Sequence, residues 1–130
     1  MITRRQAVGA LLTLSVFASA PAWAARLLTK LDPDKDGTVD LAEAKNAASA
    51  LFDKLDRDHD GTLDAKELHR RLNAKEFATA DPDKDGTLDK DEYLALVEQR
   101  FKAADPDNDG TVDAKELRSR AGKALARLLR

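Results

Sequence analysis

The sequence predicts an all-α domain in which short helices alternate with four acidic loops. The first observation is a twelve-residue phrase, D-x-D-x-D-G-T-[V/L]-D-x-x-E, which begins at residues 32, 56, 81 and 105. The second is the spacing of the copies, because only 12, 13 and 12 residues separate the last glutamate of one copy from the first aspartate of the next. Internal repeats of this kind indicate an array of similar structural units. We therefore expect one small domain that contains four copies of one loop.

Each copy matches the EF-hand pattern, a loop that binds Ca²⁺ and similar cations. Such a cation takes about six to eight oxygen ligands, which explains the acidic residues at loop positions 1, 3 and 5. Glycine at position 6 allows a sharp turn, position 7 offers its backbone carbonyl, and glutamate at position 12 can give two oxygens. With position 9 added, the predicted metal ligands are Asp32, Asp34, Asp36, Thr38, Asp40, Glu43, Asp56, Asp58, Asp60, Thr62, Asp64, Glu67, Asp81, Asp83, Asp85, Thr87, Asp89, Glu92, Asp105, Asp107, Asp109, Thr111, Asp113 and Glu116.

Position 9 is aspartate in every copy, so each loop carries five carboxylates at ligand positions, and these positions hold 20 of the 24 acidic residues of the chain. Two unit charges 4 Å apart interact by about 4 kcal/mol at an effective dielectric constant near 20. Without metal, the carboxylates of one loop therefore repel one another strongly. We expect a loose metal-free state that becomes compact when metal binds.

The short spacers cannot hold two helices and a linker, as a conventional pair of EF-hands requires. Residues 41–55 and 90–104 are therefore predicted to be single helices that neighbouring hands share. The middle spacer differs, because Asn73 followed by Glu76 three residues later is typical of a helix N-terminus. A break at Asn73 lets loops II and III pair through Leu63 and Leu88 at position 8. Loops I and IV then pair through Val39 and Val112.

The core is predicted to come from leucine and phenylalanine residues at helical spacing. The last residues, from Leu117 through Leu125 to Leu129, are expected to add one final helix despite Gly122. Because this core is small, we expect bound metal to stabilise the fold. The core residues expected ahead of the loops are Leu28, Leu31, Phe52, Leu55, Phe77 and Phe101.

The first 24 residues resemble a secretory signal peptide. Arg4 and Arg5 precede an apolar run over residues 7–20, and Ala22-Trp23-Ala24 fits the small-x-small pattern of a cleavage site. We expect residues 25–130 to form the mature metal-binding domain, exported to the periplasm by a Sec or Tat route. After cleavage, no stable membrane insertion is expected.

Composition excludes several other functions. The mature part keeps 20 basic and 24 acidic residues, a net charge of −4, which argues against a nucleic-acid partner. The chain has no cysteine, so thiolate metals lack their preferred ligand and hard cations are favoured. An enzyme is not expected, because His59 and His69 have no visible nucleophile beside them.

The chain as a whole resembles the lanmodulins, periplasmic lanthanide-binding proteins of methylotrophic bacteria. The features that carry the resemblance are the four closely spaced loops, the aspartate at position 9, the closing segment from Ala121 to Arg130, and proline at position 2 as Pro33, Pro82 and Pro106. Arg57 in loop II departs from the proline pattern. The resemblance implies a three-helix core between the paired loops and a preference for lanthanide(III) ions over Ca²⁺.

The function predicted from the sequence is therefore an exported EF-hand protein that binds lanthanide ions, folds on binding them, and buffers or ferries them in the periplasm. The alternative is a periplasmic calcium buffer or sensor. A sensor of the kind with a methionine-rich groove is disfavoured, because Met1 is the only methionine. A protein partner is possible through the basic C-terminal segment, which contains Arg118, Arg120, Lys123, Arg127 and Arg130.

Overall fold

The computed structural model describes residues 21–68 and 71–130. The predicted leader therefore lies mostly outside the described residues, as does His69. The fold is all-α apart from four very short strands, as predicted. Its elements are α2 (Ala22–Leu31), β1 (Thr38–Asp40), α3 (Leu41–Leu55), β2 (Thr62–Asp64), α4 (Ala74–Ala80), β3 (Thr87–Asp89), α5 (Lys90–Ala104), β4 (Thr111–Asp113), α6 (Ala114–Leu117) and α7 (Arg120–Ala126).

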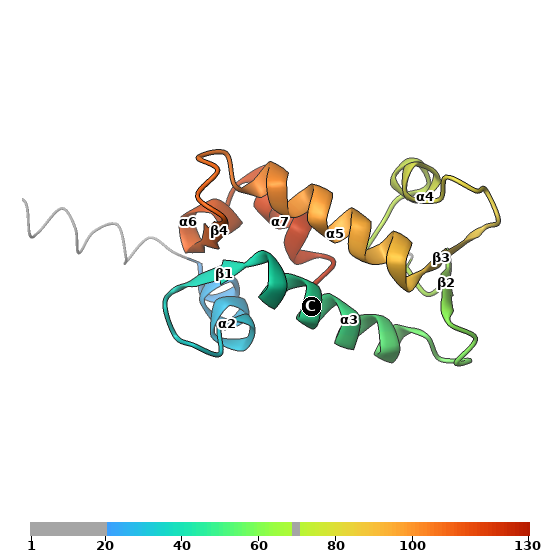
Figure 1. Cartoon of the computed structure of the whole chain (residues 1–130), viewed down its shortest axis with the longest axis horizontal. Helices are drawn as coiled ribbons and strands as arrows, with labels where there is room; N and C mark the ends of the chain where they lie inside the picture. Colours follow the sequence, from blue (N-terminus) through green and yellow to red (C-terminus); the bar gives the residue numbers. More distant parts are fainter. Residues whose placement is uncertain (1–20, 69–70) are drawn as a thin grey trace, which may run out of the picture.

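The two long helices α3 and α5 are the helices that neighbouring loops share, so this prediction is confirmed. They pack against each other along their length (Figure 1). Alanines at positions 44 and 48 of α3 are fully buried, and such small side chains allow helices to approach closely. Phe52 of α3 meets Tyr93 of α5 edge to face, with ring centroids 5.7 Å apart. Ion pairs from Lys45 to Glu98 and from Lys90 to Asp53 connect the two helices.

Two antiparallel strand pairs connect the loops, one at each end of the molecule (Figure 1). Strand β1 pairs with β4 so that Val39 faces Val112, and β2 pairs with β3 so that Leu63 faces Leu88. All four side chains are buried. The predicted pairing of loop I with loop IV and of loop II with loop III is therefore confirmed at the level of register.

Helix α7 completes a small core of three helices by packing against α5. The Tyr93 hydroxyl donates a buried hydrogen bond of 2.8 Å to the carbonyl of Leu128, which follows α7. Arg100 of α5 donates to the carbonyl of Ala124 in α7, also at 2.8 Å. These bonds hold the C-terminal segment against α5, and the burial of Leu128 and Leu129 makes the chain end part of the core.

The prediction of one final helix is wrong, because the segment forms two short helices. Helix α6 ends at Leu117, and the Ser119 side chain accepts a hydrogen bond from the Gly122 amide as the N-cap of α7. A Cβ atom at Gly122 would collide with the Glu116 carbonyl oxygen and lie 2.5 Å from Leu117 Cα. Gly122 therefore allows α7 to fold back tightly on α6, which a continuous helix would not do.

The flanks of loops II and III are less regular. Residues 65–68 form turns after β2, and α4 begins at the predicted Asn73 break with a complete capping box to Glu76. The core prediction holds for Leu28, Leu31, Phe52 and Phe101, which are buried, whereas Phe77 and Leu55 are only partly buried. Both of these residues flank the II/III end, where fewer helices are available to cover them. In the described part of the chain, none of the helices combines the length and apolar character needed to span a bilayer.

Candidate metal centres

Every loop begins with an aspartate that ends the preceding segment and turns into the loop. These position 1 carboxylates are 5 to 7% exposed. In loop I, Asp32 accepts a hydrogen bond of 2.8 Å from the Gly37 amide, five residues ahead, and the other loops repeat this bond at 2.9 Å. The glycine has a φ of 81° to 84° in all four loops, which is the left-handed region. The backbone thus folds around the position 1 carboxylate before any ligand is considered.

The position 5 aspartates brace the loop from the other side. Asp36 accepts hydrogen bonds from both the amide and the hydroxyl of Thr38, each at 2.9 Å. The other three loops repeat the pair of bonds with distances between 2.9 and 3.1 Å. Each threonine also begins a β-strand. The threonine side chain therefore holds the turn, and its backbone carbonyl is the group that the pattern assigns to the ion.

Carboxylate oxygens gather within 4.8 Å of one another in each of the four loops. In loops I and III the groups are the three aspartates at positions 1, 3 and 5. Loop II brings together positions 1, 3 and 12, and loop IV brings together all four of positions 1, 3, 5 and 12. The gathered residues are Asp32, Asp34 and Asp36; Asp56, Asp58 and Glu67; Asp81, Asp83 and Asp85; and Asp105, Asp107, Asp109 and Glu116.

The position 9 aspartates lie outside these clusters and have a structural role that the sequence analysis missed. Asp40 accepts a hydrogen bond of 2.8 Å from the Glu43 amide, and the Glu43 side chain accepts one of 2.9 Å from the Asp40 amide. The same reciprocal pair occurs at Asp64, Asp89 and Asp113. The signal was present in the sequence, because D-x-x-E at the start of a helix is a capping box. The cap uses Oδ1 of the aspartate, so Oδ2 is the oxygen that can face an ion or its water.

The clustered carboxylates perturb one another's protonation. Contact with the Asp32 carboxyl, followed by burial and the charges of Asp36 and Glu43, raises the pKa of Asp34 to about 6. Contact with Asp81 is likewise the main cause that raises the pKa of Asp83 to about 6. Position 3 of the other two loops shifts in the same direction, since the Asp56 and Asp105 carboxyls raise the pKa values of Asp58 and Asp107. Each cluster holds negative charge that a cation would relieve.

A buried carboxylate oxygen in loop III indicates that a cation fits there. The Oδ1 atom of Asp81 is buried and accepts no hydrogen bond from the described residues. A buried carboxylate oxygen without a partner is costly, and a bound cation is the usual partner for it. Asp83 and Asp85 place further oxygens within 4.8 Å. The donor set contains only oxygen, which suits hard cations such as Ca²⁺ and lanthanide(III) ions.

Loop II differs from the others at position 2. The Arg57 amide donates to Glu67 Oε2 at 3.2 Å and also to the Leu55 carbonyl at 2.9 Å. Proline stands at this position in the other loops and has no N–H to donate. In loop II, both oxygens of the position 12 glutamate are therefore held by backbone amides, since Oε1 accepts from Asp64 at 3.0 Å. An ion that recruits Glu67 must displace at least one of these bonds.

The arrangement defines a helical protein that holds cations in short carboxylate loops paired through a two-stranded bridge. A family model described as "EF hand" matches residues 49–73, 72–97 and 96–119, together more than half of the chain. The chain belongs to the EF-hand family, whose members bind metal and are not catalysts. Loop I lies outside the matched segments but has the same glycine, threonine and capping-box geometry as the other loops. No curated protein matches the chain significantly.

Proposed function

We propose that this EF-hand protein binds lanthanide(III) ions in preference to Ca²⁺, folds on binding them, and buffers or ferries them in the periplasm. The observation that carries the proposal is the same in all four loops. Three or four carboxylates are gathered within 4.8 Å, and the aspartate at position 9 stands at the edge of each loop as a helix cap. So much negative charge is favourable only around an ion that can neutralise it.

The charge of the ion decides between the two metals. Coulomb attraction to a cluster of carboxylates grows in proportion to the charge of the ion, so a trivalent ion gains half as much again as a divalent one of similar size. A trivalent ion also loses more hydration energy when it enters the loop. The preference for lanthanide ions is supported by the number of carboxylates in each loop. It is also supported by the proline at loop position 2, in which the chain resembles the lanmodulins.

Folding on metal follows from the same clusters. The buried aspartate at position 1 of each loop follows directly on a helix as its C-cap, so its charge lies where the helix meets the loop. Without metal, repulsion among its neighbours pushes these parts apart. Binding to the folded state alone stabilises that state by mass action. Metal is therefore expected to convert a loose chain into the compact one.

Export to the periplasm is proposed from the leader pattern. The expected cleavage after Ala24 would remove the first three residues of α2, among them the partly buried Trp23 and the fully buried Ala24. Leu27, Leu28 and Leu31 would remain to anchor the shortened helix. The proposal is thus compatible with a stable mature domain that begins at Ala25.

A calcium buffer is the second candidate, and the family match favours it, because EF-hand loops bind Ca²⁺ as a rule. Both metals would take the same carboxylate oxygens of the clusters. The two candidates therefore differ in selectivity, which must be measured.

Terbium luminescence provides the measurement. Tyr93 is buried and directly follows Glu92 of loop III, so excitation of tyrosine should sensitise a terbium ion in that loop. We expect the emission to persist in a hundredfold excess of Ca²⁺, which corresponds to a preference of more than about 2.7 kcal/mol. The Tyr93→Phe variant of the chain from Ala25 onward is the control, because it keeps the carboxylates of loop III and loses the only tyrosine, and residues 25–130 contain no tryptophan. Displacement of terbium by Ca²⁺ at comparable concentration would establish the calcium buffer instead.

A further inference from the structure

Helix α4 is joined to two other helices through one acidic side chain. The helix lies beside α5 at the II/III end, and none of its residues is fully buried (Figure 1). Phe77 and Ala80 are partly buried against the core. The Oε1 atom of Glu76 lies 3.3 Å from Arg100 of α5 and 3.5 Å from Arg127 at the end of α7. One carboxylate thus connects three helices.

The two oxygens of Glu76 have separate partners. Oε2 accepts a hydrogen bond of 2.8 Å from the Asn73 amide and so completes the capping box of α4. Oε1 is the atom that meets the two guanidinium groups. The cap needs only a hydrogen-bond acceptor, which glutamine also provides, whereas the ion pairs need a negative charge. Glu76→Gln therefore removes the ion pairs and keeps the cap.

Arg100 extends the connection from α4 to α7. Its side chain is only 11% exposed, and its Nη1 atom donates a hydrogen bond of 2.8 Å to the Ala124 carbonyl. Burial lowers the pKa of Arg100, and the charge of Glu76 opposes this shift. Removing the partner of a partly buried charge destabilises a protein strongly, whereas breaking an exposed ion pair costs little. The pair between Glu76 and Arg100 should therefore matter more than an ion pair on the open surface.

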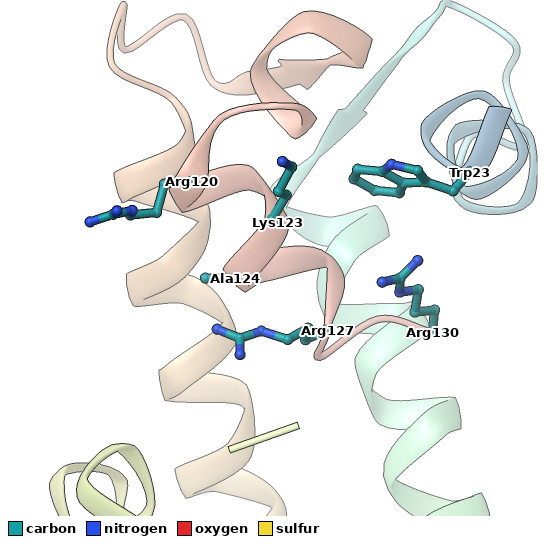
Figure 2. Close-up of a pocket in the computed structure, with 6 residues that line it drawn as sticks. All are labelled: Trp23, Arg120, Lys123, Ala124, Arg127 and Arg130. Carbon is teal, nitrogen blue, oxygen red and sulfur yellow. The ribbon is translucent and has the colours of Figure 1, made fainter. Parts of the chain in front are cut away.

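Glu76 also keeps two like charges together. Arg127 is the C-cap of α7, and its side chain extends from the helix end toward α5, on the side where Ala124 lies (Figure 2). It contacts the same Oε1 atom as Arg100. Without the charge of Glu76, the two guanidinium groups would repel each other. The carboxylate therefore holds α7 against α5 as well as holding α4.

The position of α4 affects metal binding because α4 ends at the first ligand of loop III. Asp81 is the C-cap of α4 and is 5% exposed. Its Oδ1 atom is the buried oxygen that accepts no hydrogen bond from the described residues. Asp83 and Asp85 complete the cluster from within the loop. A small rotation of α4 would therefore move Asp81 relative to the other two carboxylates.

We infer that Glu76 is a positioning residue for metal binding in loop III. Through Arg100 and Arg127 it holds α4, and thereby Asp81, in place beside the other carboxylates of the loop. The same contacts make loop III depend on α7, a segment that follows loop IV in the chain. The inference rests on metal binding by the EF-hand loops, and the proposed preference for lanthanide ions is not required.

The test compares the four loops within one sample. The isotope-labelled full-length protein is titrated with lanthanum, at free concentrations set by a chelator, and followed by nuclear magnetic resonance. The amide of each loop glycine reports its own loop, because it donates a hydrogen bond to the position 1 carboxylate. These glycines are Gly37, Gly61, Gly86 and Gly110. The same titration with Ca²⁺ makes failure of the lanthanide proposal and failure of this inference distinguishable.

Glu76→Gln should lower the affinity of loop III by about fivefold relative to that of loop I. Loop II should lose less, because it meets loop III only through the strand pair. The ratio of the parent affinity to the variant affinity at loop III should shrink in about 1 M salt, since salt screens the ion pairs that the variant lacks. Loss of a packing contact alone would not give this salt dependence.

Glu98→Gln is the matched control. It makes the same change in net charge at a side chain of similar exposure, 35% against 27% for Glu76. Glu98 pairs with Lys45 and Lys102, neither of which lies in α4. We expect its substitution to change the affinity of loop III less than about twofold.

Arg127→Gln tests the dependence on α7. The Arg127 side chain is 42% exposed, so its loss should leave the fold intact. Alone, the substitution should lower the affinity of loop III by about twofold. Combined with Glu76→Gln, it should instead restore part of the lost affinity, because it removes the repulsion between Arg127 and Arg100.

Three results would overturn the inference. An unchanged affinity of loop III in Glu76→Gln would mean that α4 keeps its position without the ion pairs. An equal loss in Glu98→Gln would mean that loop III responds only to net charge. A double variant of Glu76 and Arg127 whose loss is the product of the two single losses would mean that the residues act independently.

Discussion

The two ends of this molecule contain the same strand pairing but differ in what surrounds it. At the I/IV end, the Val39–Val112 pair is flanked by α2, which has four buried residues, and by α6 and α7, whose Leu117, Leu125 and following leucines are buried. At the II/III end, the Leu63–Leu88 pair is flanked by turns and by α4, in which no residue is fully buried.

The difference shows that similar loops do not confer similar stability. Stability comes largely from apolar area removed from water, and the I/IV end has more helical surface to bury. The II/III end has Leu68 and Leu72 on one side and the partly buried Phe77 on the other. It should therefore depend more on metal. The first experiments below test this comparison, and the last two concern the effect of pH on the loops.

Removal of metal should open the II/III end first. We expect amide hydrogen exchange in residues 74–80 to accelerate by at least about tenfold more than exchange in residues 27–31, because α4 has less buried surface to hold it. Mass spectrometry of peptic fragments, with and without a chelator, measures both segments in one sample. Uniform acceleration would show that the two ends open together.

Gly122→Ala should destabilise the I/IV end. The new Cβ would overlap the Glu116 carbonyl oxygen and lie 2.5 Å from Leu117 Cα, and both of these atoms belong to the backbone. We expect a loss of about 3 kcal/mol in the free energy of unfolding, measured by urea denaturation of the metal-loaded protein. Ala121→Gly in the same helix serves as the control, and it should cost about 1 kcal/mol. A Gly122→Ala protein as stable as the parent would mean that α6 and α7 are not packed as described.

Asn73→Ala should weaken α4 by removing one acceptor of its capping box. The Asn73 side chain accepts from the Glu76 amide at 2.8 Å, and its loss should cost about 1 kcal/mol. The effect should appear as faster exchange in α4 and as weaker metal binding in loop III. Asn73→Asp keeps an acceptor and should change little. Ser119→Ala removes the N-cap of α7 and gives the matched measurement at the other end.

Arg57→Pro should strengthen metal binding in loop II. It removes the amide that donates to Glu67, so that the glutamate no longer has to exchange this bond for the ion. The backbone is suited to the change, since Asp56 has a ψ of 76° and Asp32, which precedes a proline, has 78°. We expect a gain of about threefold in affinity by calorimetric titration. Arg57→Ala retains the amide and should leave the affinity unchanged.

The effect of pH should appear in every loop, because the pKa of the position 3 aspartate is raised in all four. The raised pKa of about 6 at Asp34 and Asp83 means that these carboxyls bind protons below pH 6, and metal must displace those protons. Affinity in loops I and III should therefore fall as the pH drops through 6, by up to about tenfold per unit for each displaced proton. Terbium titration at pH 5 and pH 7 measures this, and equal affinities at the two pH values would contradict the raised pKa of Asp34 and Asp83.

The raised pKa values of Asp34 and Asp83 also determine how the stability of the metal-free fold changes with pH. An acid whose pKa is higher in the folded state favours folding at low pH, and this contribution disappears as the pH rises through about 6. The metal-free protein should thus contain more helix at pH 5 than at pH 7, as circular dichroism can show. A greater helix content at pH 7 than at pH 5 would contradict this prediction.

Much of the fold could be predicted because it is encoded locally. Loop spacing predicted α3 and α5, Asn73 predicted the start of α4, and position 8 predicted both strand pairs. The break after Leu117 was missed, although Ser119 is a good N-cap residue, because the leucine periodicity around it continues across the break. The burial of Phe77 was overestimated because periodicity shows which face is apolar and does not show what covers it.

The candidate site likewise has some features that the sequence predicts and others that only the folded structure shows. The sequence by itself determined the four loops, the carboxylates predicted as metal ligands, and the pairing of loop I with IV and II with III, because an EF-hand is specified by residue type and spacing over twelve positions. Only the tertiary structure decided which carboxylates gather in each loop, and that Gly122 lets α7 fold back tightly on α6. The physical reason is distance along the chain. The residues of one loop are neighbours in the sequence, so their contacts follow from the local pattern. Burial and close contact between helices depend on segments that meet only after the whole chain has folded.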